Sequence, residues 1–371
     1  MRRLASPPRP DWRAALSAYD YGEKAAPAAA CWDESVRYEF SADQIDMIEE
    51  AADEVHGLVH DAIGHVVGER LHPLLGIKPD VARMIDASWT AYGGAGEPND
   101  RLGGLFGRLD FAYDGRDSLK LLGCDYDGPT GLFESSIVQW NWLEAAFPDA
   151  DQFNGLHEGL VGRWQALASG LRDRGSVHLT CATPDSQREG ELAYLAATAD
   201  EAGLTSTLIG VQDIGWDGTS FFDVDEYRIA WLLKLYPWEA MVEEEYGAHL
   251  HTSGVPVLDP LWRMPGSNHG LLAVLWDLYP EHPNLCHASL GTGEVRSPHG
   301  TIHRSLFGLD RAAERIVGSG GVVADTGAAA NPGGTVAIAR PPSFESDGVH
   351  AIIQTWMIGN KCLGMAVRES D

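Results

Sequence analysis

Apolar and polar residues follow two different periods in the first third of the chain. After Ser41, apolar side chains recur at helical spacing from Ile45 to Val66, and Gln44 completes a capping-box pattern with Ser41. This predicts a long helix with one buried face. From Leu109 to Cys124, two apolar stretches flank a Gly-Arg-Asp turn. In the first, the large apolar residues Leu109, Phe111 and Tyr113 alternate with Asp110, Ala112 and Asp114. A period of two predicts a strand hairpin.

The middle of the chain alternates between strand-like and helix-like segments. An apolar, Trp-rich run from Leu132 to Leu143, capped near Thr130, predicts a helix. Residues 177–212 predict a strand, a helix and a second strand, which together form an α/β unit. A strand near 228–235 precedes an acidic segment that predicts a helix over Glu243 to Glu245.

The two ends of the chain and one glycine-rich segment complete the pattern. Residues 1–12 are rich in Pro and Arg and are expected to be a flexible arm. Residues 318–334 are rich in Gly and Ala without periodicity, which predicts a mobile loop or lid. Residues 348–368 predict two strands joined by a turn. The whole pattern indicates an α/β or α+β fold.

The net charge of the chain limits the classes of partner that it is expected to bind. With 54 acidic and 27 basic residues, the formal net charge is −27, which disfavours nonspecific binding to nucleic acid or an anionic membrane. Solubility or cationic partners remain as reasons for the acidity. No stretch approaches 18 uninterrupted apolar residues, so no membrane partner is expected. The five cysteines form no Cys-x-x-Cys pair, and we expect reduced thiols in the cytoplasm.

Two histidines on the first predicted helix raise the question of a metal. His56 and His60 are one helical turn apart and could hold an ion between them. No glutamate follows His56 as it would on a zinc-protease helix. We therefore favour a solvated pair over a metal site.

Several short blocks of sequence stand out along nearly the whole chain, from about residue 11 to 369. The most specific is Lys234 to Glu239, Lys-Leu-Tyr-Pro-Trp-Glu, in front of an acidic segment. The other blocks are Gly107 to Asp110, Lys120 to Leu122, Asp127 to Thr130 with Glu134, Gln139 to Glu144, Glu243 to Gly247, Asp259 to Trp262, Ser267 to Asn268, Gly270 to Leu272, His282 to Leu285 and Gly364 to Glu369. In their order and approximate spacing, these blocks resemble the synthetase domain of the glutathionylspermidine synthase family.

This resemblance implies an ATP-grasp-like fold with a preceding pre-ATP-grasp α/β region. The expected organisation is an arm over 1–12, a pre-ATP-grasp-like region over 13–145 and an ATP-grasp-like region over 146–371. The family chemistry joins a small-molecule carboxylate to an amine, with ATP and Mg²⁺ as cofactors and an acyl phosphate as intermediate. Such chemistry needs oxygen ligands for the metal, cations around the phosphates and exclusion of water.

The metal positions of the family are altered here. Arg108 and Asp110 match an Arg-x-Asp pair that serves the carboxylate substrate and the metal; the alternative is a surface ion pair on a strand. The next strand of the family carries Glu-x-Asn-x-Asp, where this chain has Gly123, Asp125 and Asp127. The resemblance implies metal binding by Asp110, Asp125 and Asp127, although the last two are also ordinary turn residues.

The nucleotide positions are only partly kept. Lys234 matches one nucleotide-contacting lysine, while the second falls at His269, whose charge is not assured at neutral pH. Arg296 stands at a third basic position, and the glycine loop that follows it in the family is replaced by His299 to Arg304. Arg368 matches a late arginine placed near the transferring phosphate; the alternative is a surface residue.

The positions that would bind the amine substrate differ most from those of the family. An acidic pair suited to a polyamine aligns with Gln187 and Arg188, which should repel spermidine and favour a neutral or anionic amine such as an amino acid. Thr130 is placed with these two residues in substrate binding. Glutathionylspermidine is therefore not the expected product.

Two functions remain after this comparison. The first is an ATP-dependent carboxylate–amine ligase with a different substrate pair, in which Arg108 and Arg368 act in catalysis. The second is a degenerate ATP-grasp protein that binds a ligand or partner, or acts without ATP. A hydrolase is a weaker third reading, because the sequence holds no Gly-x-Ser-x-Gly elbow and no spaced metal-ligand signature.

Overall fold

The structure of this protein is a computed structural model. It describes residues 1–10, 12, 32–93, 103–171, 176–291, 293–295, 297–308, 314–318, 320–326 and 334–370. Arg296, Cys31 and residues 327–333 of the predicted loop lie outside these ranges.

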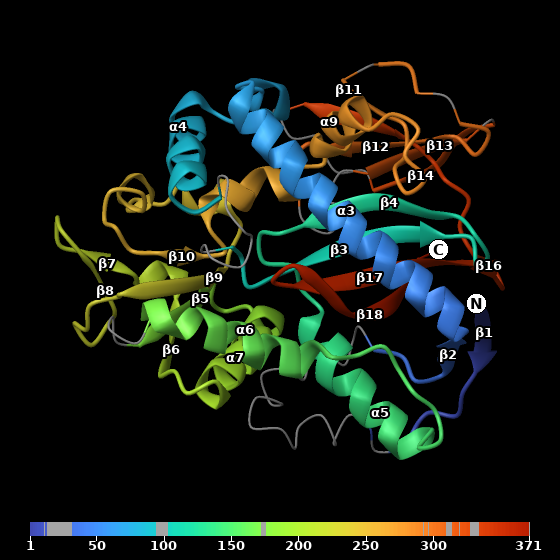
Figure 1. Ribbon diagram of the computed structural model, residues 1–371, viewed down its shortest axis with the longest axis horizontal. Coiled ribbons are helices and arrows are strands. Elements are labelled where there is room, and N and C mark those ends of the chain that lie inside the picture. Colours follow the sequence, from blue (N-terminus) through green and yellow to red (C-terminus); the bar gives the residue numbers. More distant parts are fainter. Residues whose placement is uncertain are drawn as a thin grey trace.

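A five-stranded antiparallel sheet forms the centre of the molecule (Figure 1). Its order is β16-β17-β3-β4, and β18 also pairs with β17. The strands are β3 (Phe106–Tyr113), β4 (Leu119–Asp125), β16 (Glu345–Ser346), β17 (Val349–Ile358) and β18 (Lys361–Ser370). Both predicted hairpins, β3–β4 and β17–β18, are confirmed. The pairing of β17 with β3 joins the two hairpins into one sheet.

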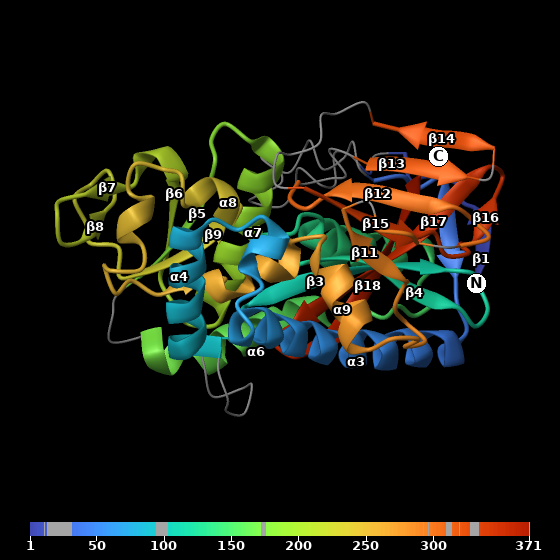
Figure 2. The same ribbon diagram turned by 90° about the horizontal axis from the view of Figure 1, so that it is seen from above.

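A second antiparallel sheet has the order β11-β15-β12-β13-β14. Its strands are β11 (Ala288–Leu290), β12 (Thr301–Ser305), β13 (Glu314–Gly318), β14 (Gly321–Asp325) and β15 (Thr335–Ala339). In Figure 2 this sheet lies on one side of the central sheet and helix α3 on the other. The prediction of an irregular loop over 318–334 is wrong for 321–325, where the chain pairs with β13 as an exposed strand.

A third, parallel sheet has the order β10-β9-β5-β6. Its strands are β5 (Val177–Cys181), β6 (Ser206–Gly210), β9 (Trp231–Leu235) and β10 (Val257–Leu258). The predicted α/β unit over 177–212 is confirmed, with α7 as the crossover between β5 and β6. Two short antiparallel pairs complete the strands: β1 (Arg2–Ala5) with β2 (Val36–Glu39), and β7 (Gly215–Trp216) with β8 (Phe221–Phe222).

Helices cover the outer faces of these sheets. The α-helices are α3 (Ala42–Gly68), α4 (Pro79–Ser88), α5 (Gln139–Ala146), α6 (Leu156–Leu171), α7 (Ser186–Glu201), α8 (Trp238–Met241) and α9 (Leu271–Leu278). Shorter turns are the 3-10 segments η2 (His72–Leu75), η6 (Val211–Asp213), η7 (Gly247–His249) and η8 (Leu261–Ser267), and the π segments η3 (Trp89–Gly93) and η4 (Glu134–Val138). Within the described residues, no helix is long and apolar enough to cross a bilayer.

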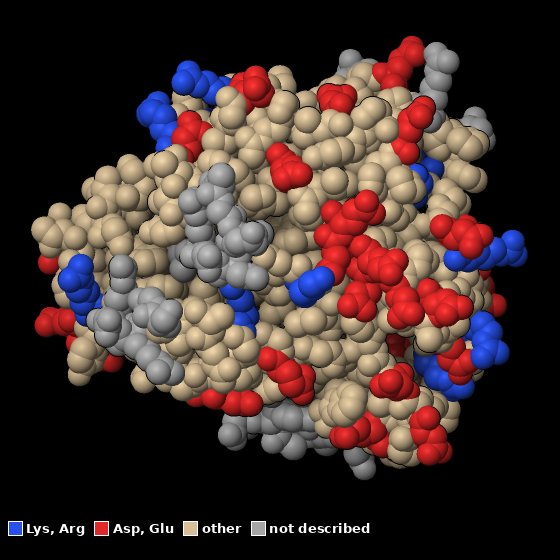
Figure 3. All heavy atoms as spheres, in the orientation of Figure 1, with Lys and Arg blue, Asp and Glu red and all other residues tan. Residues whose placement is uncertain are grey.

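Helix α3 follows its sequence pattern closely. Ser41 accepts a hydrogen bond from the backbone N–H of Gln44, whose side chain accepts one from the backbone N–H of Ser41, so the capping box is confirmed. The apolar stripe that includes Val55 and Val59 is buried against the core. Acidic side chains gather on the outer face near the N-terminal half of the helix, where Lys361 pairs with Asp53 (Figure 3).

His56 and His60 are packed rather than solvated, which corrects that expectation. The Nδ1 atom of His56 lies 2.7 Å from the hydroxyl of Tyr126, and burial lowers the pKa of His56 to about 3. The ring of His60 packs against the rings of Trp89 and Trp262, which also contact each other. The described ranges contain no group of three His, Cys, Asp or Glu residues that could hold a metal ion by themselves.

Three local predictions are wrong. Residues 2–5 of the expected arm form strand β1, and the terminal ammonium of Met1 donates to the backbone carbonyl of Gly115 at 3.1 Å. Helix α8 ends at Met241, so the acidic residues 243–245 lie in the turns that follow it. The helix after Leu132 begins without a cap from the side chain of Thr130; its first N–H groups donate to Glu191.

The core does not divide at residue 145. The central sheet takes β3 and β4 from the first predicted region and β17 and β18 from the second. One buried apolar cluster likewise contains Phe133, Trp164 and Trp356. The predicted regions 13–145 and 146–371 therefore share one sheet and one core.

Candidate active site

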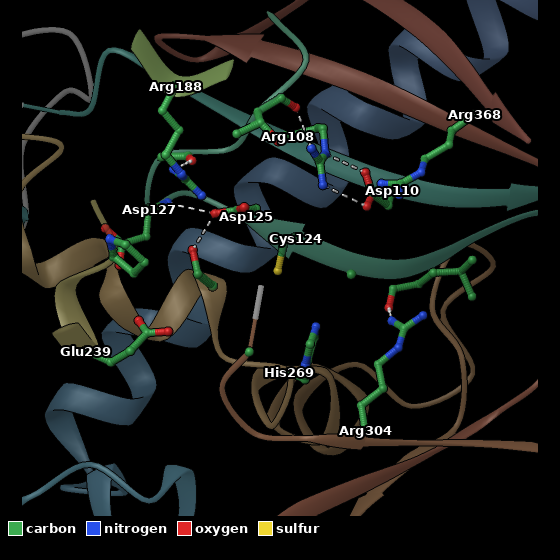
Figure 4. A pocket seen from close by; sticks show the side chains of 17 residues that line it. Arg108, Asp110, Cys124, Asp125, Asp127, Arg188, Glu239, His269, Arg304 and Arg368 are labelled. Atoms are coloured by element: carbon green, nitrogen blue, oxygen red, sulfur yellow. Dashed lines mark hydrogen bonds and ion pairs between the residues drawn. The ribbon is translucent and has the colours of Figure 1, made fainter. Parts of the chain in front are cut away.

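A pocket opens where the three sheets approach one another (Figure 4). Eight of the residues predicted from the sequence lie in its wall: Arg108, Asp110, Asp125, Asp127, Thr130, Arg188, His269 and Arg368. The other lining residues are Leu122, Gly123, Cys124, Gly128, Pro237, Glu239, Ser267, Arg304 and Gly308. Lys234 and Gln187 do not line it, and Arg296 lies outside the described residues.

Strand β3 places Arg108 and Asp110 on the same face, because side chains two apart on a strand share a face. Arg108 donates from Nε to Asp110 Oδ1 at 2.8 Å and from Nη2 to Asp110 Oδ2 at 3.2 Å. Its Nη1 donates to the backbone carbonyl of Thr130 at 2.7 Å. Gln354 on β17 donates to Asp110 Oδ1 at 3.3 Å. Arg108 therefore holds Asp110 in place and joins β3 to the segment after β4.

The two aspartates after β4 have different surroundings. Asp125 accepts hydrogen bonds at Oδ1 from the backbone N–H of Asp127 and from the hydroxyl of Ser267, both at 3.0 Å. Asp127 is buried: one oxygen pairs with the ammonium of Lys234 and the other accepts from the backbone N–H of Trp238 at 2.6 Å. The ammonium of Lys234 also lies 4.6 Å from the centre of the Trp238 ring. Both oxygens of Asp127 and the charge of Lys234 are thus engaged within the protein.

The donor set fits Mg²⁺ only in part. Asp110 and Asp125 line the pocket, and their hard oxygen atoms suit this ion. Two carboxylates do not complete an octahedral site, but Mg²⁺ commonly takes its remaining ligands from water and substrate phosphates. The pocket therefore fits Mg²⁺ arriving with a nucleotide better than a resident ion.

The wall formed by β12 differs from the sequence-based expectation. Residues 301–304, predicted as part of a replaced glycine loop, form strand β12, and Arg304 points into the space beside Gly123. An added Cβ at Gly123 would meet no atom closer than 3.6 Å, the distance to Nη1 of Arg304. Arg304 is buried, pairs with Glu314 and donates to the carbonyl of Leu122. Sequence reasoning missed this arginine, although a basic residue at the end of a strand before Gly308 was a visible signal.

His269 contributes no positive charge at neutral pH. Its Nδ1 lies 2.8 Å from the carbonyl of Ser305, a contact that requires the proton on Nδ1. Burial, together with the charge of Arg304, lowers the pKa of His269 to about 4. The cation beside His269 is therefore Arg304.

Arg188 and Arg368 enter the pocket from different elements. Arg188 on α7 donates from Nη1 to the carbonyls of Leu235 at 3.1 Å and Gly128 at 3.4 Å. Arg368 is exposed on β18, and in Figure 4 its side chain extends toward Asp110. The predicted neighbour of Arg188, Gln187, instead hydrogen-bonds to Glu134.

Two further carboxyl groups were not found by sequence reasoning. Glu239 is half-buried in the pocket wall, and burial, with the nearby Asp127, raises its pKa to about 7. Glu191 is buried and accepts from the N–H groups of Gly131 at 3.1 Å and Leu132 at 2.6 Å. Burial and the adjacent Glu134 raise the pKa of Glu191 to about 8. Glu191 thus orders the segment whose carbonyl holds Arg108.

The arrangement of the sheets defines a mixed α/β protein of the glutathione synthetase-like, ATP-grasp class. A solved structure of a glutathione synthetase-like effector from Globodera pallida covers 99% of this chain and 97% of its own, with a TM-score of 0.53. Its sequence identity is 7%, so this likeness concerns the fold alone. The chain belongs to the glutathionylspermidine synthase preATP-grasp family, whose model matches residues 3–371. The resemblance seen in the sequence is confirmed.

Curated relatives agree with this family. The chain is 32% identical over 355 residues to a Haemophilus influenzae protein named "Putative acid--amine ligase", covering 91% of this chain and 86% of that protein. It is 23% identical over 301 residues to the trypanothione synthetase of Crithidia fasciculata and 25% identical over 209 residues to the bifunctional glutathionylspermidine synthetase/amidase of Escherichia coli. It spans 44% and 33% of the length of these two enzymes.

Proposed function

We propose that this protein is an ATP-dependent carboxylate–amine ligase that forms an amide through an acyl phosphate, with a substrate pair other than glutathione and spermidine. The observation that carries the proposal is the shared pocket, in which Asp110 and Asp125 lie together with the guanidinium groups of Arg304 and Arg368. Activation of a carboxylate by a nucleotide needs both signs of charge in one site. The similarity to the Haemophilus influenzae protein supports the class of reaction.

The arginines have separate roles in this proposal. Arg368 is exposed at the pocket edge and would stabilise the charge that develops on the transferring phosphate. Arg304 would bind a neighbouring phosphate in place of the lysine that the family has at His269. It would do so through Nη2, because its Nε pairs with Glu314 and its Nη1 donates to the carbonyl of Leu122. Arg108 is a positioning residue, because its guanidinium is already engaged with Asp110 and with the carbonyl of Thr130.

The metal would be held by Asp110 and Asp125. When bound there with the nucleotide, Mg²⁺ would neutralise part of the phosphate charge. Asp127 is not included, because its side chain is only 2% exposed and binds Lys234 and the backbone of Trp238, whereas the side chain of Asp110 stays 28% exposed beside Arg108. Its contribution is to hold the loop that carries Asp125.

The proposal is tested by binding and by trapping. Calorimetric titration of the full chain with Mg·ATP should show saturable binding. Incubation with Mg·ATP, hydroxylamine and a library of peptides and carboxylic acids should give a hydroxamate and ADP in equal amounts, because hydroxylamine captures acyl phosphates. Absence of Mg·ATP binding up to millimolar concentration would overturn the ligase proposal.

A degenerate ATP-grasp protein is the second candidate, and one observation favours it. The two positions that match nucleotide-contacting lysines present no free charge: Lys234 is paired with Asp127, and His269 is neutral. If the charge of Arg304 does not compensate for these changes, the pocket binds a ligand without using ATP. The same titration separates the candidates, since only the ligase requires Mg·ATP to bind.

A further inference from the structure

One end of the pocket carries two side chains of opposite charge, Arg188 and Glu239, that have no role in the proposed activation of the carboxylate. This end is formed by Arg188, Glu239 and the loop with Asp125 and Asp127. In Figure 4, Arg188 and Glu239 lie on opposite sides of this loop. The pocket end can therefore meet a small molecule with a cation on one side and a carboxylate on the other.

The guanidinium of Arg188 is fixed in orientation. Two backbone carbonyls, of Gly128 and Leu235, accept from its Nη1, and Asp185 lies 3.5 Å from its Nε. Among the described residues, no group hydrogen-bonds to its Nη2. An arginine held in this way presents a preorganised donor edge that suits a carboxylate.

The carboxylate of Glu239 lacks a counter-charge of its own. It is half-buried, and in the described part of the chain no other side chain hydrogen-bonds or pairs with it. The charged groups facing it are Asp127, Asp125 and Lys234, and the charge of Lys234 is taken by Asp127. Desolvating a carboxylate without a partner is costly, and an ammonium from a ligand would supply the missing charge.

We propose that the amine substrate is an α-amino acid, bound as a zwitterion with its carboxylate at Arg188 and its ammonium at Glu239. This deepens the proposed ligase function and rests on it, because it names the class of amine that the enzyme joins to its acid. Arg188 excludes a polyamine, which has cations at both ends and no carboxylate, while Glu239 excludes a dicarboxylate without an amine. The two residues together determine specificity.

The test measures binding to the full chain by calorimetry. The probes are each of the twenty protein amino acids and spermidine, first alone and then with Mg²⁺ and a nonhydrolysable ATP analogue. The tightest amino acid is compared with its amide, which lacks the carboxylate, and with its desamino acid, which lacks the ammonium. Each derivative should bind about tenfold or more weakly, as expected for loss of one charged hydrogen bond.

Variants link the two charges to the two residues. Arg188→Gln should weaken the amino acid about tenfold and leave its amide unchanged, whereas Glu239→Gln should weaken the amino acid and leave the desamino acid unchanged. Arg188→Glu should shift preference to spermidine. Glu243→Gln is the matched control, because Glu243 is exposed and pairs with Lys78 outside the pocket. Arg188→Lys keeps the positive charge and removes the planar guanidinium. It replaces the other Arg188 variants in this test if they fail to fold.

The proposal is overturned if no amino acid binds under either condition, if spermidine binds more tightly than every amino acid, or if Glu239→Gln and the folded Arg188 variants bind as wild type does. These outcomes are separate from failure of the ligase function. Binding of an amino acid is measured without turnover, whereas the ligase function fails when Mg·ATP does not bind.

Discussion

Single side chains decide how much charge the pocket presents. Lys234 and Asp127 are both buried and neutralise each other, and the backbone of Trp238 satisfies the second carboxylate oxygen. Removing one partner from such a pair leaves a buried charge without compensation. Lys234 therefore stabilises the wall of the pocket without lining it. Arg368 and Arg304, the latter paired with Glu314, bring their guanidinium groups to its lining.

Lys234→Met is expected to lower the free energy of unfolding by about 3–5 kcal/mol, because Asp127 remains buried without its partner. Urea denaturation measures this loss. Lys361→Met is the control, since Lys361 is exposed and its pairing with Asp53 is worth about 0–1 kcal/mol. Unchanged stability of Lys234→Met would show that the pair does not support the fold.

Asp110→Ala and Arg368→Ala are each expected to reduce acid-dependent ADP release by about a hundredfold or more, because one removes a metal ligand and the other a phosphate cation. Circular dichroism should show a folded protein in both cases. Arg2→Ala is the control, because Arg2 is exposed and pairs with Glu39 away from the pocket. Wild-type rates in both variants would contradict the assignment of the site.

At the scale of elements, the segment from Asp127 to Leu132 connects three parts of the fold. Its first residue binds Lys234 on β9, its Thr130 carbonyl binds Arg108 on β3, and its last two N–H groups bind Glu191 on α7. A displacement of α7 would therefore move this segment and, through Thr130, the side chain of Arg108 on β3. The same helix carries Arg188, so the two sides of the pocket share one support.

Glu191 gives this support a dependence on pH. Its pKa is raised from 4.5 to about 8, so the folded protein binds more protons than the unfolded chain between these values. Stability from this group is full below about pH 4.5 and is lost as pH rises through 8. Denaturation midpoints measured from pH 5 to 9 should therefore fall with pH, and Glu191→Gln should flatten the decline. An equal decline in wild type and variant would exclude Glu191 as its source.

The hydrophobic pattern along the chain predicted the elements that bury one apolar face. It did not predict the elements whose structure depends on a contact with a residue distant in sequence. Helix α3 and the hairpin β3–β4 were predictable, because their periods of burial are regular. The short α8, the strand that carries Arg304 and the capping by Glu191 were not. Each depends on a partner distant in sequence: Asp127 for α8, Leu122 for Arg304 and Leu132 for Glu191.

At the scale of the whole molecule, the pocket belongs to no single sheet. Its wall takes Asp110 from the central sheet, Arg304 from the second sheet, and Arg188 and Glu239 from segments next to the parallel sheet. Side-chain types on these elements were predictable from the family resemblance, but the meeting of β12 with Gly123 was not. A ligand in this pocket would join all three sheets.

Mg·ATP at a hundred times its Kd is expected to stabilise the folded protein by about 2.7 kcal/mol, since it binds a site that exists only when the sheets are assembled. Urea denaturation with and without the nucleotide measures this gain. Arg304→Gln, with its guanidinium removed, should lose most of it. Equal unfolding curves for wild type with and without Mg·ATP would count against a nucleotide site.

The pairing of β17 with β3 has a consequence for biosynthesis. Strand β3 is buried at seven of its eight positions, and β4 pairs with one of its edges, but the strand that pairs with the other edge, β17, begins only at Val349. A ribosome that adds about 5–20 residues per second needs ten seconds or more to reach it from Tyr113. Throughout that interval one edge of the nascent hairpin has unpaired backbone groups, so the emerging chain is most prone to aggregate before its final strands leave the exit tunnel.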